Sequence, residues 1–133
     1  MIFVDTSFWV ALINQRDAHH AEALALLHRY GTDPLSTTNH VVGETWTFLG
    51  RRMGHAAAVR FLDMIDQSPR LQIVTVPPSL EEEALLWLRR HDEREYSFVD
   101  ATSFALMRSL TIRDALAFDG DFSAAGFHEL RVA

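Results

Sequence analysis

The order of predicted strands and helices restricts the fold of this chain more than any other feature of its sequence. Short β-prone runs are expected at residues 2–4, 35–38, 71–76, 114–118 and 128–132. Between them lie segments whose apolar residues recur at helical spacing. Strands that alternate with helices form a parallel sheet joined by right-handed crossovers, with helices on both faces. The sequence therefore predicts an α/β fold, a three-layer α/β/α sandwich with a central parallel sheet.

Several helix boundaries are visible in the sequence. Serine followed by an acid three residues later, as in Ser79 with Glu82 and Ser97 with Asp100, is the pattern of a capping box. The polar run 89–95 is expected to be a loop between these two helices. The helix that begins at Asn39 is expected to turn Phe48 inward, and the helix after Ser79 to turn Leu85 toward the core.

Length and composition narrow the class of protein. A chain of 133 residues is expected to form one domain, residues 1–133. It has no cysteine, so any metal must be held by oxygen or histidine ligands. The apolar stretch 2–13 is too short to span a membrane and has no basic residues before it, which predicts a cytoplasmic protein without a membrane partner. The net charge of −6 argues against a protein that coats nucleic acid, although acids gathered at a metal site would explain much of it.

Two aspartates directly follow predicted strands. Asp5 comes after residues 2–4 and Asp119 after residues 114–118. Both should therefore lie at the carboxyl edge of the sheet, where ligands bind in open parallel sheets. Each also has a purely structural explanation, because Asp5 can cap the next helix and Asp119 with Gly120 is a common turn dipeptide.

Two further acids lie on predicted helices and face inward. Glu44 is three residues after Val41 on the core-facing side of its helix, where an unpaired carboxylate would cost several kcal/mol. The alternative is an ion pair with Arg51 or Arg52. Asp100 precedes apolar residues on the same helix side, but its place in the capping box with Ser97 needs no metal.

Taken together, the four acids are more specific than any one of them. Carboxylates crowd together only when protons or cations neutralise them, and hard oxygen ligands suit Mg²⁺ or Mn²⁺. Such a site activates water for phosphodiester hydrolysis. The open alternatives are a non-catalytic α/β protein-binding module and a metal-dependent phosphoesterase or DNase. The adjacent His19 and His20 point in different directions on a helix and are interpreted as surface imidazoles.

At these positions the sequence resembles the PIN domain family, in particular the small bacterial and archaeal VapC-like toxins of toxin–antitoxin pairs. The resemblance spans nearly the whole chain. It is carried by four segments in matching order, IFVDTS at 2–7, VGET at 42–45, SFVDA at 97–101 and AFDGDF at 117–122.

The resemblance implies a metal-dependent endoribonuclease, frequent homodimerisation and inhibition by a cognate antitoxin protein. Asp5, Glu44, Asp100 and Asp119 match the family's acidic site, with Asp121 as a substitute for Asp119 or an addition to it. Family members often carry a hydroxyl where this chain has an alanine at position 117, which leaves Thr6 and Ser103 as candidate supporting hydroxyls. The expected RNA-guiding arginines are Arg51, Arg52, Arg108 and Arg113.

Overall fold

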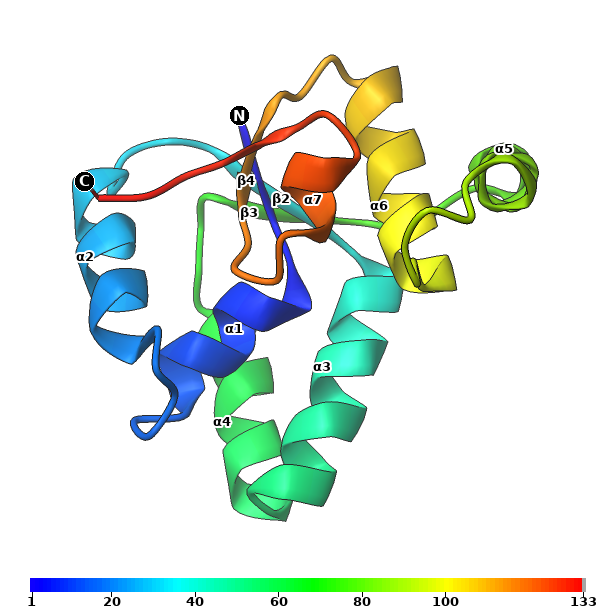
Figure 1. Ribbon diagram of the computed structural model, residues 1–133. Coiled ribbons are helices and arrows are strands. Elements are labelled where there is room, and N and C mark those ends of the chain that lie inside the picture. Colours follow the sequence, from blue (N-terminus) through cyan, green and yellow to red (C-terminus); the bar gives the residue numbers. More distant parts are fainter. Residues whose placement is uncertain (133) are drawn as a thin grey trace.

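A five-stranded parallel sheet forms the centre of the protein in the computed structural model, which describes residues 1–132 (Figure 1). In spatial order the strands are β3 (Leu71–Val74), β2 (Leu35–Thr38), β1 (Ile2–Val4), β4 (Asp114–Leu116) and β5 (His128–Glu129). Ile2 of the central strand pairs with Leu35 on one side and with Asp114 on the other. All of β1 is buried, as expected for a strand covered on both faces.

Seven helices in residues 1–132 form the outer layers. The connections from β1 to β3 run in one direction across the sheet and carry α1 (Thr6–Ile13), α2 (His20–Arg29), α3 (Asn39–Arg52) and α4 (His55–Asp66). From β3 to β5 the direction reverses, so α5 (Pro78–Arg90), α6 (Phe98–Ser109) and α7 (Asp121–Ala124) cover the opposite face. Helices α3 and α4 pack side by side, as do α5 and α6 (Figure 1). The predicted three-layer α/β/α sandwich is confirmed.

Aromatic side chains fill the core on both sides of the sheet. Phe8 of α1 is fully buried on one side, and Phe104 of α6 packs edge to face on Phe122 of α7 with ring centroids 4.9 Å apart. None of the helices in the described part of the chain is long and apolar enough to cross a membrane.

Five details differ from the sequence predictions. Phe48 is 39% exposed and Leu85 is 51% exposed, so neither belongs to the core. Ser79 makes no cap; α5 starts after Pro77, with Pro78 in its first turn. The helix also continues to Arg90, which shortens the expected loop. Strands β3 and β4 each end two residues before the predicted boundary, and β5 ends three residues before it. The short helix α7 was not predicted, because its four residues are too few to show a periodicity.

Candidate metal centre

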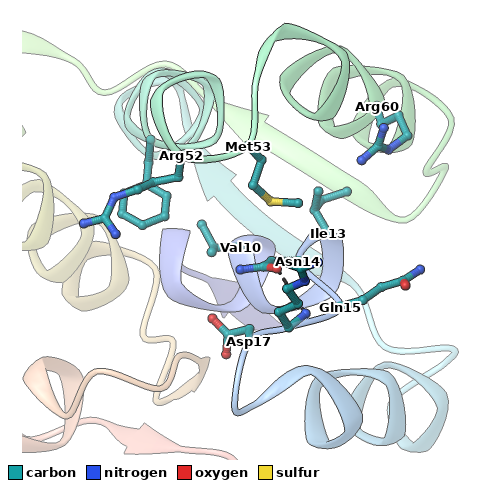
Figure 2. Close-up of a pocket in the computed structure, with 10 residues that line it drawn as sticks. Val10, Ile13, Asn14, Gln15, Asp17, Arg52, Met53 and Arg60 are labelled. Carbon is teal, nitrogen blue, oxygen red and sulfur yellow. Dashed lines mark hydrogen bonds between the residues drawn. The ribbon is translucent and has the colours of Figure 1, made fainter.

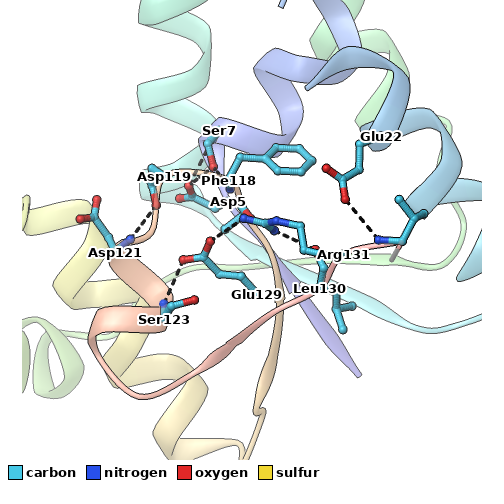
Figure 3. A network of polar contacts seen from close by, with 12 residues as sticks. Asp5, Ser7, Glu22, Phe118, Asp119, Asp121, Ser123, Glu129, Leu130 and Arg131 are labelled. Atoms are coloured by element: carbon cyan, nitrogen blue, oxygen red, sulfur yellow. Dashed lines mark hydrogen bonds and ion pairs between the residues drawn. The ribbon is translucent and has the colours of Figure 1, made fainter. Parts of the chain in front are cut away.

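Asp5 lies between the end of β1 and the start of α1. It is 2% exposed, and its Oδ2 accepts hydrogen bonds from the Ser7 amide at 3.2 Å and from the Ser7 hydroxyl at 2.8 Å. Ser7 Oγ in turn accepts a hydrogen bond from the backbone N–H of Phe118 at 3.0 Å. Asp5 therefore caps α1 and also lies at the carboxyl edge of the sheet, so the two interpretations of this residue are compatible. Ser7 ties it to the chain next to Asp119 (Figure 3).

Three further aspartates converge beside it. Asp100, Asp119 and Asp121 each offer a carboxylate oxygen within 4.8 Å of the others. Asp100 closes the predicted capping box, accepting the Ser97 N–H at 3.0 Å, while its own N–H donates to Ser97 Oγ at 2.9 Å. Asp119 accepts the N–H of Asp121 at 3.1 Å. Asp100 and Asp119 therefore each stabilise the local backbone and also belong to an acidic cluster.

Crowding and burial change the acidity of these groups. Burial raises the pKa of Asp5 well above its usual value, and the charges on Asp119 and Asp100 raise it further. Burial also raises the pKa of Asp100 to about 6. Partial removal from water raises the pKa of Asp119, with the charge on Asp121 adding to the effect. Burial and the mutual repulsion of the carboxylates therefore both favour the protonated form of these acids.

One arginine contacts the outer side of the cluster. Arg94, in the loop between α5 and α6, places Nε 2.8 Å from Asp121 Oδ1 and donates from Nη2 to the Asp119 carbonyl at 3.2 Å. Gly120 allows this approach, since it has φ +82° and a Cβ there would lie 3.2 Å from Arg94 Nη2. Sequence analysis placed Arg94 in a loop and missed this contact, because a pairing across 27 residues has no local pattern.

Glu44 joins the site from α3. It lines a cavity of about 450 Å³ together with Asp5, Ser7 and Asp119. Within residues 1–132 no ion pair links it to Arg51 or Arg52, which removes the structural explanation considered for this residue. Asp119 thus belongs to two groups: the cavity it shares with Asp5 and Glu44, and the cluster it forms with Asp100 and Asp121.

The supporting hydroxyls expected from the sequence contact other groups. Thr6 accepts a hydrogen bond from Thr45 at 3.1 Å, and Ser103 donates to the Val99 carbonyl of its own helix at 2.9 Å. Ser7 is the hydroxyl that contacts an acid of the site. This role of Ser7 was not predicted, although a hydroxyl two residues after a strand-ending aspartate is placed to hold its carboxylate.

The arginines expected to guide RNA fall into two groups. Arg51 and Arg52 line a cavity with Glu44. Arg108 lies 3.9 Å from Glu83 of α5, and Arg113 lines a cavity near β5 that contains none of the predicted site acids.

A buried acid outside the site has its own counter-charge. Glu129 of β5 is 7% exposed; its Oε1 lies 3.0 Å from Arg131 Nη2, and its Oε2 accepts the Ser123 N–H at 2.9 Å (Figure 3). Arg131 also donates to the Ala117 carbonyl at 2.8 Å, so this pair fastens the end of the chain beside the strand that leads to Asp119.

The donor set fits a divalent cation. Asp5 and Asp100 are buried carboxylates, and neither forms an ion pair with any of residues 1–132. Several carboxylate oxygens, with no cysteine in the chain, are the ligands that Mg²⁺ and Mn²⁺ prefer. A cation bound between them would supply the missing positive charge.

The chain as a whole is similar to known proteins. The chain matches the PIN domain family over residues 2–128. It is 58% identical over 133 residues to the 23S rRNA-specific endonuclease VapC20 of Mycobacterium tuberculosis, in strains H37Rv and CDC 1551 / Oshkosh, with 98% of each chain covered.

Two solved structures share the fold. The crystal structure of Mycobacterium tuberculosis VapC20, a sarcin-ricin loop cleaving toxin, has a TM-score of 0.91 at 56% identity and covers 98% of this chain and 99% of that one. VapBC2 of Rickettsia felis, bound to a DNA fragment from its promoter, has a TM-score of 0.71 at 14% identity, covering 98% and 97%. The second likeness concerns the fold alone.

Proposed function

The chain belongs to the PIN-domain family, and on that premise we propose that it cleaves ribosomal RNA at the acidic site made of Asp5, Glu44, Asp100 and Asp119. The endoribonuclease class predicted from the sequence is confirmed by this membership and by the full-length similarity to a 23S rRNA-specific endonuclease. The observation that carries the proposed substrate is the 58% identity across 98% of both chains, which favours the sarcin-ricin loop of 23S rRNA.

The proposed roles follow from position and charge. Asp5, Asp100 and Asp119 would hold Mg²⁺ or Mn²⁺. Glu44 lines the same cavity as Asp5 and Asp119, where it would orient water or a second cation. The bound metal supplies Lewis acidity and stabilises negative charge on the phosphate. Ser7 keeps the Asp5 carboxylate in place. Asp121 is already paired with Arg94, so we assign the fourth position to Asp119.

The proposed partners rest on family membership. VapC toxins pair with an antitoxin, and we propose a cognate antitoxin and a homodimer for this chain. A ribosomal substrate would place its action in the cytoplasm. Size-exclusion chromatography with light scattering tests the dimer, which should have twice the monomer mass of 15.1 kDa.

The test uses purified ribosomes, deproteinised 23S rRNA and DNA of the sarcin-ricin sequence. Each is incubated with wild-type protein and Asp5→Asn, in Mg²⁺, in Mn²⁺ and in chelator. Asp63→Asn is the matched control, because Asp63 is an exposed aspartate on α4 outside the pocket. We expect one cut in 23S rRNA that needs metal and Asp5 but not Asp63.

Other outcomes would assign a different function. Cleavage of DNA at a similar rate would favour a general nuclease. Absence of both metal binding by calorimetry and cleavage of every substrate would contradict the ribonuclease and favour a binding module.

A further inference from the structure

Aromatic side chains line the cavity that holds Asp5, Glu44 and Asp119. Phe118 and the exposed His19 contribute to this lining, and so does Phe48 of α3. The metal centre itself does not need these rings.

His19 is held in a defined orientation. Its ring stacks on Phe118 with centroids 4.4 Å apart and an interplanar angle of 3°. Its backbone N–H donates to Asp17 Oδ1 at 2.8 Å, which fixes the turn before α2. Phe118 is itself stacked on Phe8, with centroids 5.8 Å apart, and has the Arg131 guanidinium 4.9 Å from its centroid. The imidazole is therefore the exposed end of an aromatic stack that is anchored in the core.

This stack is coupled closely to the acids. Phe118 directly precedes Asp119, and its N–H donates to the Ser7 hydroxyl that holds Asp5. Any group resting against His19 is therefore close to the carboxylates, within the same cavity.

Phe48 connects this cavity to a basic one. A neighbouring cavity of about 760 Å³ shares Val10, Asp17 and Phe48 with it and is also lined by Arg16, Arg52 and Arg60. Figure 2 shows Arg52 on α3 and Arg60 on α4 at opposite sides of that second cavity. The Arg52 guanidinium lies 5.2 Å from the Phe48 ring centroid. Arginines next to aromatic rings are suited to a single strand, whose phosphates and bases need different contacts.

Building on the proposed ribonuclease function, we propose that His19, backed by Phe118, and Phe48 form a nucleobase subsite that accepts an unpaired base flanking the scissile phosphate. Base stacking on an aromatic ring tolerates any base, so the subsite selects unpaired nucleotides rather than a sequence. The arginines of the neighbouring cavity then receive the phosphates on that side.

The experiment measures base stacking separately from cleavage. A short hairpin RNA with 2-aminopurine beside the cut site is titrated with the Asp5→Asn protein, and quenching of its fluorescence reports stacking. In this background, His19→Ala and Phe48→Ala should each weaken binding by roughly 5- to 150-fold, the contribution of one stacked base. His19→Phe should restore binding and quenching because it keeps the ring. His28→Ala, an exposed histidine on α2 outside the cavity, is the matched control.

In a chain that keeps Asp5, His19→Ala should raise KM more than it lowers kcat. An RNA with an abasic nucleotide in place of the 2-aminopurine should remove the difference in KM between His19→Ala and the wild type. Equal binding and quenching by His19→Ala, Phe48→Ala and His28→Ala would overturn the subsite while leaving the ribonuclease intact. Absence of cleavage by the wild-type chain would instead contradict the proposed function, so the two failures are distinguishable.

Discussion

Two buried acids, Asp5 after β1 and Glu129 in β5, differ in what neutralises them. Glu129 has Arg131 at 3.0 Å and the Ser123 amide at 2.9 Å. Asp5 is buried at least as deeply, yet it has the Ser7 hydroxyl and amide as donors and other acids nearby. A charge removed from water costs several kcal/mol unless an opposite charge offsets it. Burial alone therefore does not separate the two acids, whereas the absence of a counter-charge distinguishes Asp5, the proposed metal ligand, from Glu129.

The largest expected effect concerns Asp5, the proposed metal ligand. Asp5→Asn keeps the size of the side chain and an acceptor for Ser7, but it removes a metal-binding charge. We expect cleavage of 23S rRNA to slow by about 10³-fold or more under single-turnover conditions. Glu129→Gln should lose much less activity in the same assay. Equal losses in the two variants would break the distinction drawn between these acids.

The next effect concerns stability and pH. Asp100 has a usual pKa of 3.8 and a pKa of about 6 in the fold. Its protonated form therefore stabilises the metal-free fold fully below pH 3.8, and this contribution is lost as the pH rises through about 6. The asparagine of Asp100→Asn does not ionise, so the variant does not lose this stability as the pH rises. At pH 7.5 its free energy of unfolding should exceed that of the wild type by about 2–3 kcal/mol.

Urea unfolding in chelator at pH 4 and at pH 7.5 checks this prediction. The gap between the two proteins should close at the lower pH. Saturating Mg²⁺ should also narrow it at pH 7.5, because metal binds the folded wild type in preference. A constant gap at both pH values would mean that Asp100 is neutralised within the fold.

A smaller effect is expected at the structural acid. Glu129→Gln weakens the contact with Arg131 and leaves a neutral acceptor for Ser123, which should cost about 1–2 kcal/mol of unfolding free energy. Thermal unfolding in chelator measures this loss of stability. The change is opposite to that of Asp100→Asn, which should gain stability at pH 7.5. A rise in stability would show that Glu129 also lacks effective neutralisation.

The smallest expected effect concerns Arg94, an arginine at the edge of the acidic cluster. Arg94 is exposed and pairs with Asp121 at the edge of the acidic cluster. Removing it in Arg94→Ala should raise the affinity for Mn²⁺ only about two- to fivefold, because exposed pairs contribute little. Calorimetry measures this affinity, with Arg29→Ala on α2 as the control. A decrease in affinity would mean that Arg94 orders the cluster rather than competing with the cation.

The fold could be predicted from the sequence, and the acids could be proposed from it, because both leave local patterns. Asp5 follows an apolar strand and Asp100 follows Ser97 at capping-box spacing, and each could be placed from its neighbours. Phe48 was expected in the core because its spacing fits the inward stripe of α3, but it projects into the site cavity instead. A periodic pattern records that a residue is apolar, without distinguishing a core contact from a ligand contact.

The features that were missed depend on long-range contacts. The role of Ser7 was not predicted, and one of its contacts is with Phe118, 111 residues further along the chain. Arg94 likewise contacts Asp121 from a loop that carries no periodic signal, and Arg131 contacts the Ala117 carbonyl 14 residues earlier in the chain. Such pairings are decided by how the strands assemble, and a single sequence does not display them.

The placement of β1 in the middle of the sheet has a consequence for the protein's own synthesis. Asp5 is among the first residues made, but its strand needs β4 as a neighbour, and Asp119 follows only after that strand. Contacts between such distant parts of a chain form late in folding. In a partly translated chain the acids are therefore not yet gathered into one site. The cell that makes this ribonuclease meets its activity only when synthesis of the chain is nearly complete.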